Sequence, residues 1–313
     1  MLRRLLAAHC VGMEGNAKRR GHKEGRKGAV PARVFFLLAR QAPIAVIFRR
    51  GPSDWVELVK WNTDSDTFEA GQWFHGRIYE RRCDLTPDGL LLIYFAHKIN
   101  LRTLANREYT KAWTAVSRPP YLTALALWPK GDCWHGGGLF DTNSSLVLNH
   151  KLDASRPNPK HLPSGLDVRL REHVCGEDDP IFSERLERDG WRLKQEWEVE
   201  NRGYPSMYLT RQPEVREKRC PDGSQVLQLT RSISGLDYSE HFAIRHAEDS
   251  HWIAIDRANW ADWDTRGRLV LARDGKLLAG SLNNSSDLES QELINLDSDA
   301  PTSVRAPEWA ARW

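Results

Sequence analysis

The sequence contains little that would place it in a membrane or in a disulfide-bonded scaffold. Its 313 residues are 40% hydrophobic and 28% charged, and no uninterrupted apolar run comes near the roughly 18 residues of a membrane span. The five cysteines are an odd number, widely spaced and without a CxxC pair. The apolar stretch of MLRRLLAAHC is too short for an export signal. We therefore expect a globular chain in the reducing cytoplasm.

Complete catalytic and nucleotide-binding motifs are also missing. The sequence has no P-loop, no GxGxxG after a strand, no HExxH, no EF-hand loop and no GxSxG nucleophile elbow. The commonest nucleotide, metalloprotease and serine-hydrolase chemistries therefore have no support, and we expect no cofactor.

The charge is unevenly distributed. Residues 1–33 hold nine Lys and Arg against Glu14 and Glu24, so a local balance of +7 leaves −4 for the rest of a chain whose net charge is +3. This Gly-rich basic segment can bury almost nothing, and we expect it to be disordered. An arm of this kind can bind nucleic acid through phosphate contacts, but the mildly acidic remainder makes nucleic acid an unlikely partner.

A set of matches at offsets of 134 to 137 residues indicates a tandem duplication. They preserve their order, and they pair Pro43 with Pro180, Trp55 with Trp191, Trp61 with Trp197, Arg82-Cys83 with Arg219-Cys220, Pro87-Asp88-Gly89 with Pro221-Asp222-Gly223, and Trp128 with Trp263. The Pro-rich segment 151–164 lies where a junction is needed. We expect a first β half at 34–150, a linker at 151–164 and a related second half at 165–313.

Alternation with a period of two dominates both halves and predicts strands. In residues 191–199, Trp191, Leu193, Trp197 and Val199 would share one face of a single strand. Short apolar runs bounded by turn residues recur throughout, which is typical of sandwiches, barrels and propellers. Long amphipathic helices are not evident, and the best helical candidate is the C-terminal PEWAARW, with Pro307 at its start.

Several turns resemble those of a known repeat family. Thr86-Pro87-Asp88-Gly89 and Pro221-Asp222-Gly223 each precede an apolar strand, and Asp264-Thr265-Arg266-Gly267 leads into another. Such turns resemble those of WD40-like and TolB-like β-propeller blades. The resemblance implies an all-β, propeller-like repeat fold. Two tandem β-sheet domains are the alternative, because the number of candidate strands fits both.

The most unusual segment is GDCWHGGGLF, residues 131–140. Asp132, Trp134 and His135 combine an acid, an aromatic surface and a titratable base just before Gly137, where the backbone can bend. Trp73 and His75 form a second Trp/His cluster in the same half. We expect residues 134–138 to leave regular strand geometry and to border a pocket that all six of these residues help to form. A sharp structural bend is the other interpretation.

A metal site has weaker support. Cys133 and His135, and likewise His173 and Cys175, are pairs two residues apart, so each pair would share one face of a strand. Four such residues can form a Cys₂His₂ zinc site, but natural ligand pairs usually have more residues between them. Buried Cys and partly buried His residues are the expected reading, without a metal.

The 13 tryptophans favour a binding role, since indole rings provide large contact areas. Our leading hypothesis is a non-catalytic β-repeat protein that binds a protein partner or a small polar ligand. The alternative is an enzyme acting on carbohydrate or a related polar substrate through carboxylates beside tryptophans, such as Asp262 and Asp264. A catalytic pair of carboxylates would converge in a concave pocket, and one of them would have a raised pKa.

Overall fold

The computed structural model describes residues 30–51, 54–106, 108–172, 178–203, 207–234 and 237–313. Within these ranges the chain forms 23 strands in five sheets, together with three short α-helices. The prediction of an all-β fold is confirmed. Residues 1–29 of the basic segment lie outside the described residues, and Arg33, expected in the same segment, opens the first strand.

Sheet A is an antiparallel meander of four strands that follow one another in the chain. These are β1 (Arg33–Leu38), β2 (Ile44–Arg50), β3 (Trp55–Asn62) and β4 (Thr67–His75). Most of β1 and β2 is buried, so both faces of these strands are covered, as their continuous Val, Ile, Leu and Phe runs indicate. β4 is the outer strand and is much more exposed.

Sheets B and C follow in the chain. Sheet B contains β5 (Arg77–Ile78), β6 (Asp84–Leu85), β7 (Leu92–His97), β8 (Ala112–Ser117) and β9 (Ala126–Pro129). Helix α1 (Leu101–Ala105) lies between β7 and β8. Sheet C contains β10 (Gly138–Phe140), β11 (Ser145–Leu148) and β12 (Asp167–Leu170), and β11 and β12 pair in parallel. Two 3₁₀ turns, η2 (Glu80–Arg82) and η3 (Leu152–Ala154), lie in the connections.

Sheets D and E complete the strands. Sheet D contains β13 (Arg192–Gln195), β14 (Glu198–Gly203), β15 (Met207–Gln212), β16 (Glu214–Arg219), β17 (Gln225–Ser234), β18 (Asp237–His246) and β19 (Ile253–Ile255). Sheet E is a second meander, formed by β20 (Ala258–Trp263), β21 (Leu269–Arg273), β22 (Lys276–Leu282) and β23 (Leu288–Asn295).

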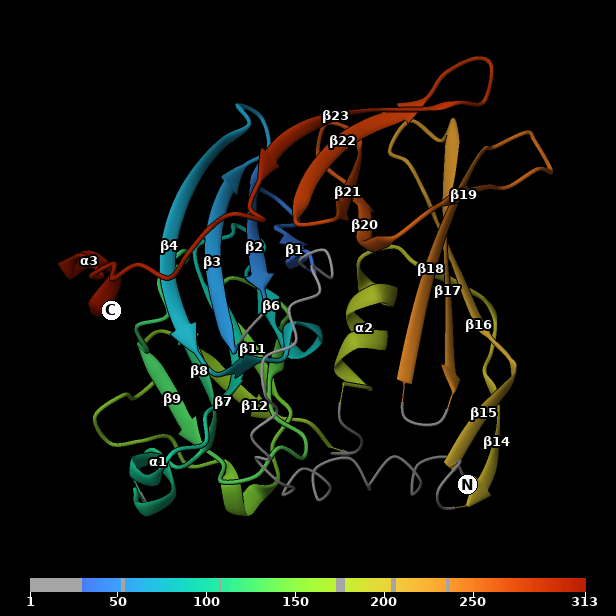
Figure 1. Ribbon diagram of the computed structural model, residues 1–313. Coiled ribbons are helices and arrows are strands. Elements are labelled where there is room, and N and C mark those ends of the chain that lie inside the picture. Colours follow the sequence, from blue (N-terminus) through green and yellow to red (C-terminus); the bar gives the residue numbers. More distant parts are fainter. Residues whose placement is uncertain (1–29, 52–53, 107, 173–177, 204–206, 235–236) are drawn as a thin grey trace, which may run out of the picture.

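The sheets and helix α2 (Ile181–Arg188) contact one another in a closed cyclic order (Figure 1). β1 of sheet A contacts β6 of sheet B, and β6 and β7 contact β10 of sheet C. α2 contacts β10 on one side and β13 of sheet D on the other, and β18 of sheet D contacts β20 of sheet E. β20 and β21 contact β1, which closes the ring of sheets.

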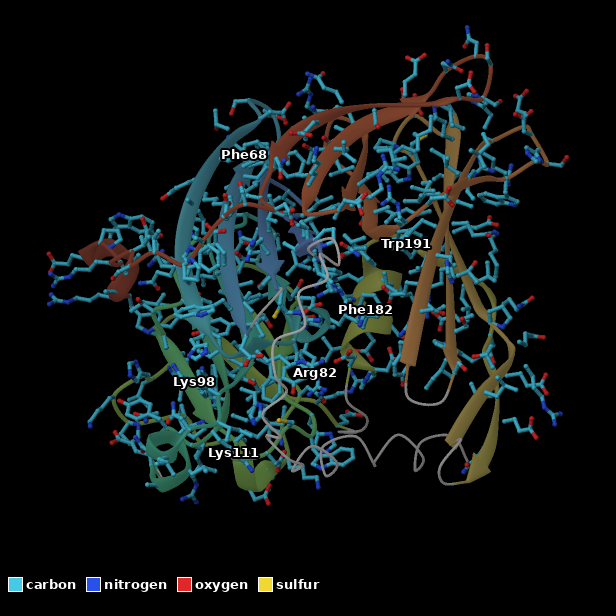
Figure 2. The ribbon with its side chains drawn as sticks, viewed as in Figure 1. Phe68, Arg82, Lys98, Lys111, Phe182 and Trp191 are labelled. Carbon is cyan, nitrogen blue, oxygen red and sulfur yellow. The ribbon has the colours of Figure 1, made fainter. Side chains whose placement is uncertain are left out.

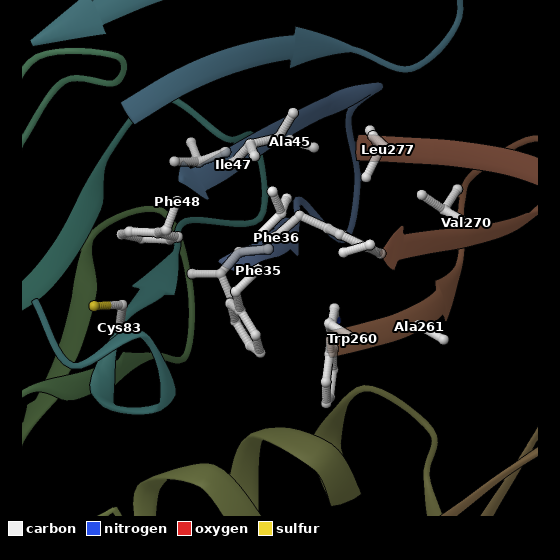
Figure 3. Packing of buried hydrophobic residues seen from close by; sticks show 14 of the residues in the cluster. Phe35, Phe36, Ala45, Ile47, Phe48, Cys83, Trp260, Ala261, Val270 and Leu277 are labelled. Atoms are coloured by element: carbon white, nitrogen blue, oxygen red, sulfur yellow. The ribbon is translucent and has the colours of Figure 1, made fainter. Parts of the chain in front are cut away.

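Trp260 of β20 is the centre of an aromatic cluster that joins four parts of this ring (Figure 3). Its ring centroid lies 4.8 Å from Phe35 of β1, 5.7 Å from Phe182 of α2, 6.3 Å from Trp191 and 5.7 Å from Phe242 of β18. All five side chains are buried. Figure 2 shows Phe182 on α2 and Trp191 directly after it, in the middle of the molecule. The cluster therefore packs the helix against sheets A, D and E at once.

Buried arginines fix the same helix through polar contacts. Arg231 of β17 is 3% exposed, and it donates to Glu214 at 3.0 Å and to Asp179, just before α2, at 3.3 Å. Its guanidinium also lies over the Phe182 ring, 4.8 Å from the centroid. On the other side, Arg185 of α2 donates to the backbone carbonyl of Cys83, just before β6 of sheet B. Each buried charge thus has hydrogen-bond partners, as burial requires.

The C-terminal segment returns from sheet E across sheet A to sheet B. Arg49 of β2 donates to the Leu296 carbonyl at 3.0 Å, and Gln72 of β4 donates to the Val304 carbonyl at 3.0 Å. The expected short helix is present as α3 (Glu308–Ala311), preceded by Pro307. Beyond it, Trp313 donates its indole N–H to the Leu162 carbonyl at 2.9 Å.

The single strand predicted over residues 191–199 is wrong. This stretch contains β13 and the start of β14, which are separate strands of sheet D. Trp191 is completely buried, whereas Leu193, predicted on the same face, is 44% exposed. The reason is that Trp191 leaves the strand path to join the cluster around Trp260.

The proposed duplication is visible only at one turn. Gly89 and Gly223 both have positive φ angles, 72° and 78°, and both close a turn before an apolar strand, β7 and β17. In contrast, Pro43 precedes strand β2, while its counterpart Pro180 begins helix α2. β11 and β12, from either side of the expected linker, pair with each other. The division into two related halves stays a prediction.

Among the helices in the part of the chain that the structure describes, none has the length and apolar character needed to cross a membrane.

Replacing Trp260 by Ala should lower the free energy of unfolding by about 3–5 kcal/mol, because it removes the ring that packs α2 against three sheets. Unfolding in guanidinium chloride measures this loss. Trp309→Ala is the control, since Trp309 is 56% exposed, and we expect it to cost less than about 1 kcal/mol. Equal losses in the two variants would contradict the central role of Trp260.

Candidate functional site

The segment expected to form a site, residues 131–138, lies between sheets B and C. Residues 134–137 lie outside regular strands, and Gly138 opens β10. The Asp132 carboxylate accepts the Trp134 N–H at 2.9 Å and pairs with Lys130. The Asp132 carboxylate therefore stabilises a local turn through contacts with its sequence neighbours.

The three glycines are needed for packing against sheets B and C. A Cβ at Gly136 would overlap the Phe95 ring, and one at Gly137 would overlap the Arg82 carbonyl oxygen. The Gly137 N–H donates to the Thr114 hydroxyl at 2.9 Å, and its φ is +75°. The glycine run thus lets the backbone approach protein neighbours closely.

His135 is 8% exposed, and the polar groups around it keep it uncharged. Burial and, to a smaller extent, the nearby charges of Lys130 and Lys151 together lower its pKa to about 4. Its backbone carbonyl accepts from Arg82 Nη1 at 2.6 Å, and its φ of +59° is unusual for a residue other than glycine. His135 is therefore held neutral beneath the surface.

The structure does not bring Trp73 and His75 to this segment. Both lie on β4 of sheet A, where Trp73 packs under the Arg49 guanidinium at 5.2 Å and His75 stacks on Trp55 at 4.7 Å. Of the metal candidates, Cys133 is buried and not part of a disulfide among the described residues, while His173 and Cys175 lie outside those residues. Among the described residues no group of three or more side chains could hold a metal ion.

A better candidate is a cleft of about 410 Å³ that is lined by several elements of the ring, called here the central cleft. Sheets A, B, D and E and helix α2 all contribute to its wall. The lining residues are 36–40, 84, 185, 186, 188–191, 218, 260 and 262–265. None of residues 131–138 lines this cleft.

One wall of the central cleft carries a network around Arg188, at the end of α2. Its guanidinium forms a bidentate pair with Asp84 of β6, at 2.7 and 2.9 Å, and also donates to Asp189 at 2.8 Å. Asp84 in turn accepts the backbone N–H of Phe140 at 2.8 Å. Because the pair is forked and partly buried, it fixes the positions of both side chains.

The lining of the central cleft also contains a second pair, Lys218 of β16 and Asp262 of β20, 2.6 Å apart. Asp262 also accepts the Trp263 backbone N–H at 2.7 Å. Burial nevertheless raises the pKa of Asp262, and the nearby carboxylate of Asp189 adds to this effect against the opposing influence of Lys218. A carboxyl group with a raised pKa thus lies beside tryptophan in a concave site.

Sequence reasoning singled out Asp262 and Asp264 as carboxylates beside tryptophans but did not connect them to other residues. Asp84, Arg188 and Lys218 were missed. Their signal in the sequence was slight: Asp84 lies in a mixed segment after Arg82 and Cys83, and Arg188 belongs to a charged run that is typical of a solvated helix face. Only the folded ring brings these separate segments together.

No known protein family matches the chain, and no curated protein has a similar sequence.

Replacing Gly137 by Ala should destabilise the protein by more than about 3 kcal/mol, because strain at positive φ adds to a collision with the Arg82 carbonyl. Gly131→Ala is the matched control: its φ is +86°, but no atom lies within 4 Å of the added Cβ. We expect it to cost only about 1–2 kcal/mol. Thermal and denaturant unfolding measure both, and similar losses would contradict the packing role of Gly137.

Proposed function

We propose that this chain is a non-catalytic, propeller-like β protein that binds a small polar ligand in the central cleft. The observation that carries the proposal is the convergence there of charged side chains from sheets B, D and E and helix α2. A charged wall built from so many segments suits recognition of one compact polar molecule.

The cyclic order of the sheets supports the propeller-like part of the proposal. In a propeller, four-stranded sheets are arranged radially around a central channel. Sheets A and E are four-stranded meanders, and their first strands, β1 and β20, contact each other. In this interpretation α2 takes the place of a strand contact between sheets C and D, and the central cleft lies beside it.

The size of the cleft supports a small ligand more than a protein partner. A volume of about 410 Å³ lies within the range of about 300–1,000 Å³ typical of small-molecule sites. Its tryptophans, Trp191, Trp260 and Trp263, are at most 5% exposed. The tryptophans therefore form the shape of the cleft wall, and the charged side chains are the groups that would contact the ligand.

The protein is proposed to act in the cytoplasm. Among the described residues Cys83, Cys133 and Cys220 form no disulfide, as expected in a reducing compartment.

Hydrolysis of a carbohydrate is the second candidate, favoured by the raised pKa of Asp262 and its neighbour Asp189. Each of the two carboxylates is already paired with a cation, Lys218 or Arg188, which favours binding over catalysis. Cleavage of nitrophenyl glycosides by the wild type, lost in Asp262→Asn, would establish the enzyme instead.

Ligand binding is tested by filling the central cleft from its edge. Thr265 lines the cleft and is exposed, so Thr265→Trp adds bulk at its edge. Thr265→Ser is the control that keeps the hydroxyl bonded to Thr63, and Thr265→Val is the control that removes this hydrogen bond without adding bulk. We expect some members of a panel of hexoses, amino acids and hexose phosphates to raise the melting temperature of the wild type and of Thr265→Ser.

Thr265→Trp should remove that stabilisation and weaken binding about tenfold or more, measured by calorimetry. If compounds that bind the wild type bind Thr265→Trp equally well, the ligand occupies another site and the proposal fails.

A further inference from the structure

Two of the four cations that line the central cleft, Arg40 and Arg185, have no carboxylate partner among the described residues. Arg40 donates to the carbonyls of Phe140, at 2.7 Å, and Asp141. Arg185 donates to the carbonyls of Glu80, at 3.2 Å, and Cys83. Backbone carbonyls orient these guanidinium groups but do not neutralise them.

The carboxylates that line the cleft form ion pairs with cations other than Arg40 and Arg185. Asp84 and Asp189 pair with Arg188, and Asp262 pairs with Lys218. The remaining one, Asp264, pairs with Arg268 at 2.8 Å, and its side chain is fully buried. The positive charges of Arg40 and Arg185 therefore remain uncompensated by a direct ion pair.

Three buried donor atoms of cleft-lining residues also lack an acceptor within the described ranges. They are Nε of Arg40, Nη2 of Arg185 and the indole Nε1 of Trp191. Arg185 is 3% exposed and Trp191 is completely buried, so a missing acceptor is costly. All three atoms are donors, which specifies a ligand group that accepts hydrogen bonds.

The two arginines share one electrostatic environment. Burial lowers the pKa of both, and the same neighbours, Asp84, Arg188 and Asp189, act on each. Burial disfavours their charged forms and Arg188 adds repulsion at both, while Asp84 and Asp189 offset part of these effects. A negative charge bound in the cleft would offset the remainder.

We infer that the ligand of the central cleft carries an oxyanion, a carboxylate or a phosphate, and that Arg40 and Arg185 bind it. This inference rests on the proposed binding function and adds the chemical class of the ligand. A planar guanidinium fork matches the paired oxygens of both groups, and lysine cannot reproduce that match.

The test compares three hexoses of nearly equal size: glucose, glucuronate and glucose 6-phosphate. Calorimetric titration of the wild-type protein at low salt, with inorganic phosphate as a fourth probe, should give binding to at least one charged hexose about tenfold or more tighter than to glucose. Preference for glucuronate identifies a carboxylate, and preference for glucose 6-phosphate, accompanied by binding of inorganic phosphate, identifies a phosphate.

Arg40→Gln should weaken binding of the preferred hexose about tenfold or more, with a smaller loss in Arg40→Lys. Arg257→Gln is the control, because Arg257 is an exposed cation paired with Asp274 outside the cleft. If Arg40→Gln does not fold, the comparison of the hexoses on the wild type still decides.

Equal affinity of the wild type for glucose and its charged analogues would overturn the oxyanion inference. In that case the proposed binding function would still stand if Thr265→Trp abolished the binding of these hexoses. The inference would also be overturned if no charged probe bound at millimolar concentration. The proposed function is tested separately, by the panel of hexoses, amino acids and hexose phosphates with the wild type and Thr265→Trp.

Discussion

Burial of Trp260 against helix α2 is the interaction on which the rest of this structure depends. In the cyclic order of contacts, α2 is the link between sheet C and sheet D, and an empty space at that position would be unfavourable because its walls would lose their packing contacts. α2 fills the space with Phe182 and Leu186, and Trp260 packs that helix against β1 and β18. Sheets that are far apart in the sequence are thereby held in one arrangement.

The same helix gives the centre its charge. Arg185 and Arg188 leave α2 toward sheet B, and Arg188 ends in a forked pair with Asp84. Because two of the eight residues of α2 are these arginines, the helix contacts its neighbours through polar groups as well as apolar ones. The central cleft lies beside these polar groups. The same helix thus serves the structure and the proposed function: its apolar residues pack in the core, and its Arg185, which has no carboxylate partner among the described residues, lines the central cleft.

The sequence was sufficient for features set by local rules. Alternation and short apolar runs predicted an all-β chain, and Pro-Asp-Gly predicted the turns that Gly89 and Gly223 close at positive φ. It was insufficient where tertiary contacts decide. Helix α2 was missed because Arg185 counts as polar, although Ile181, Phe182, Arg185 and Leu186 are buried at helical spacing. The triple glycine drew attention to residues 131–138, yet its close neighbours, Phe95 and Arg82, come from other segments and could not be foreseen. The central cleft combines segments from residue 36 to residue 265, and no local pattern records that they meet.

The most direct test of this account is hydrogen exchange of the unliganded wild-type protein, resolved to peptides covering α2, β1 and β20. If Trp260 and α2 hold the ring together, the amides of residues 181–188 should exchange as slowly as those of residues 33–38 and 258–263, because all three open only when the core opens. Rapid exchange in α2 while β1 and β20 stay protected would show that the sheets assemble without the helix, and it would contradict the account.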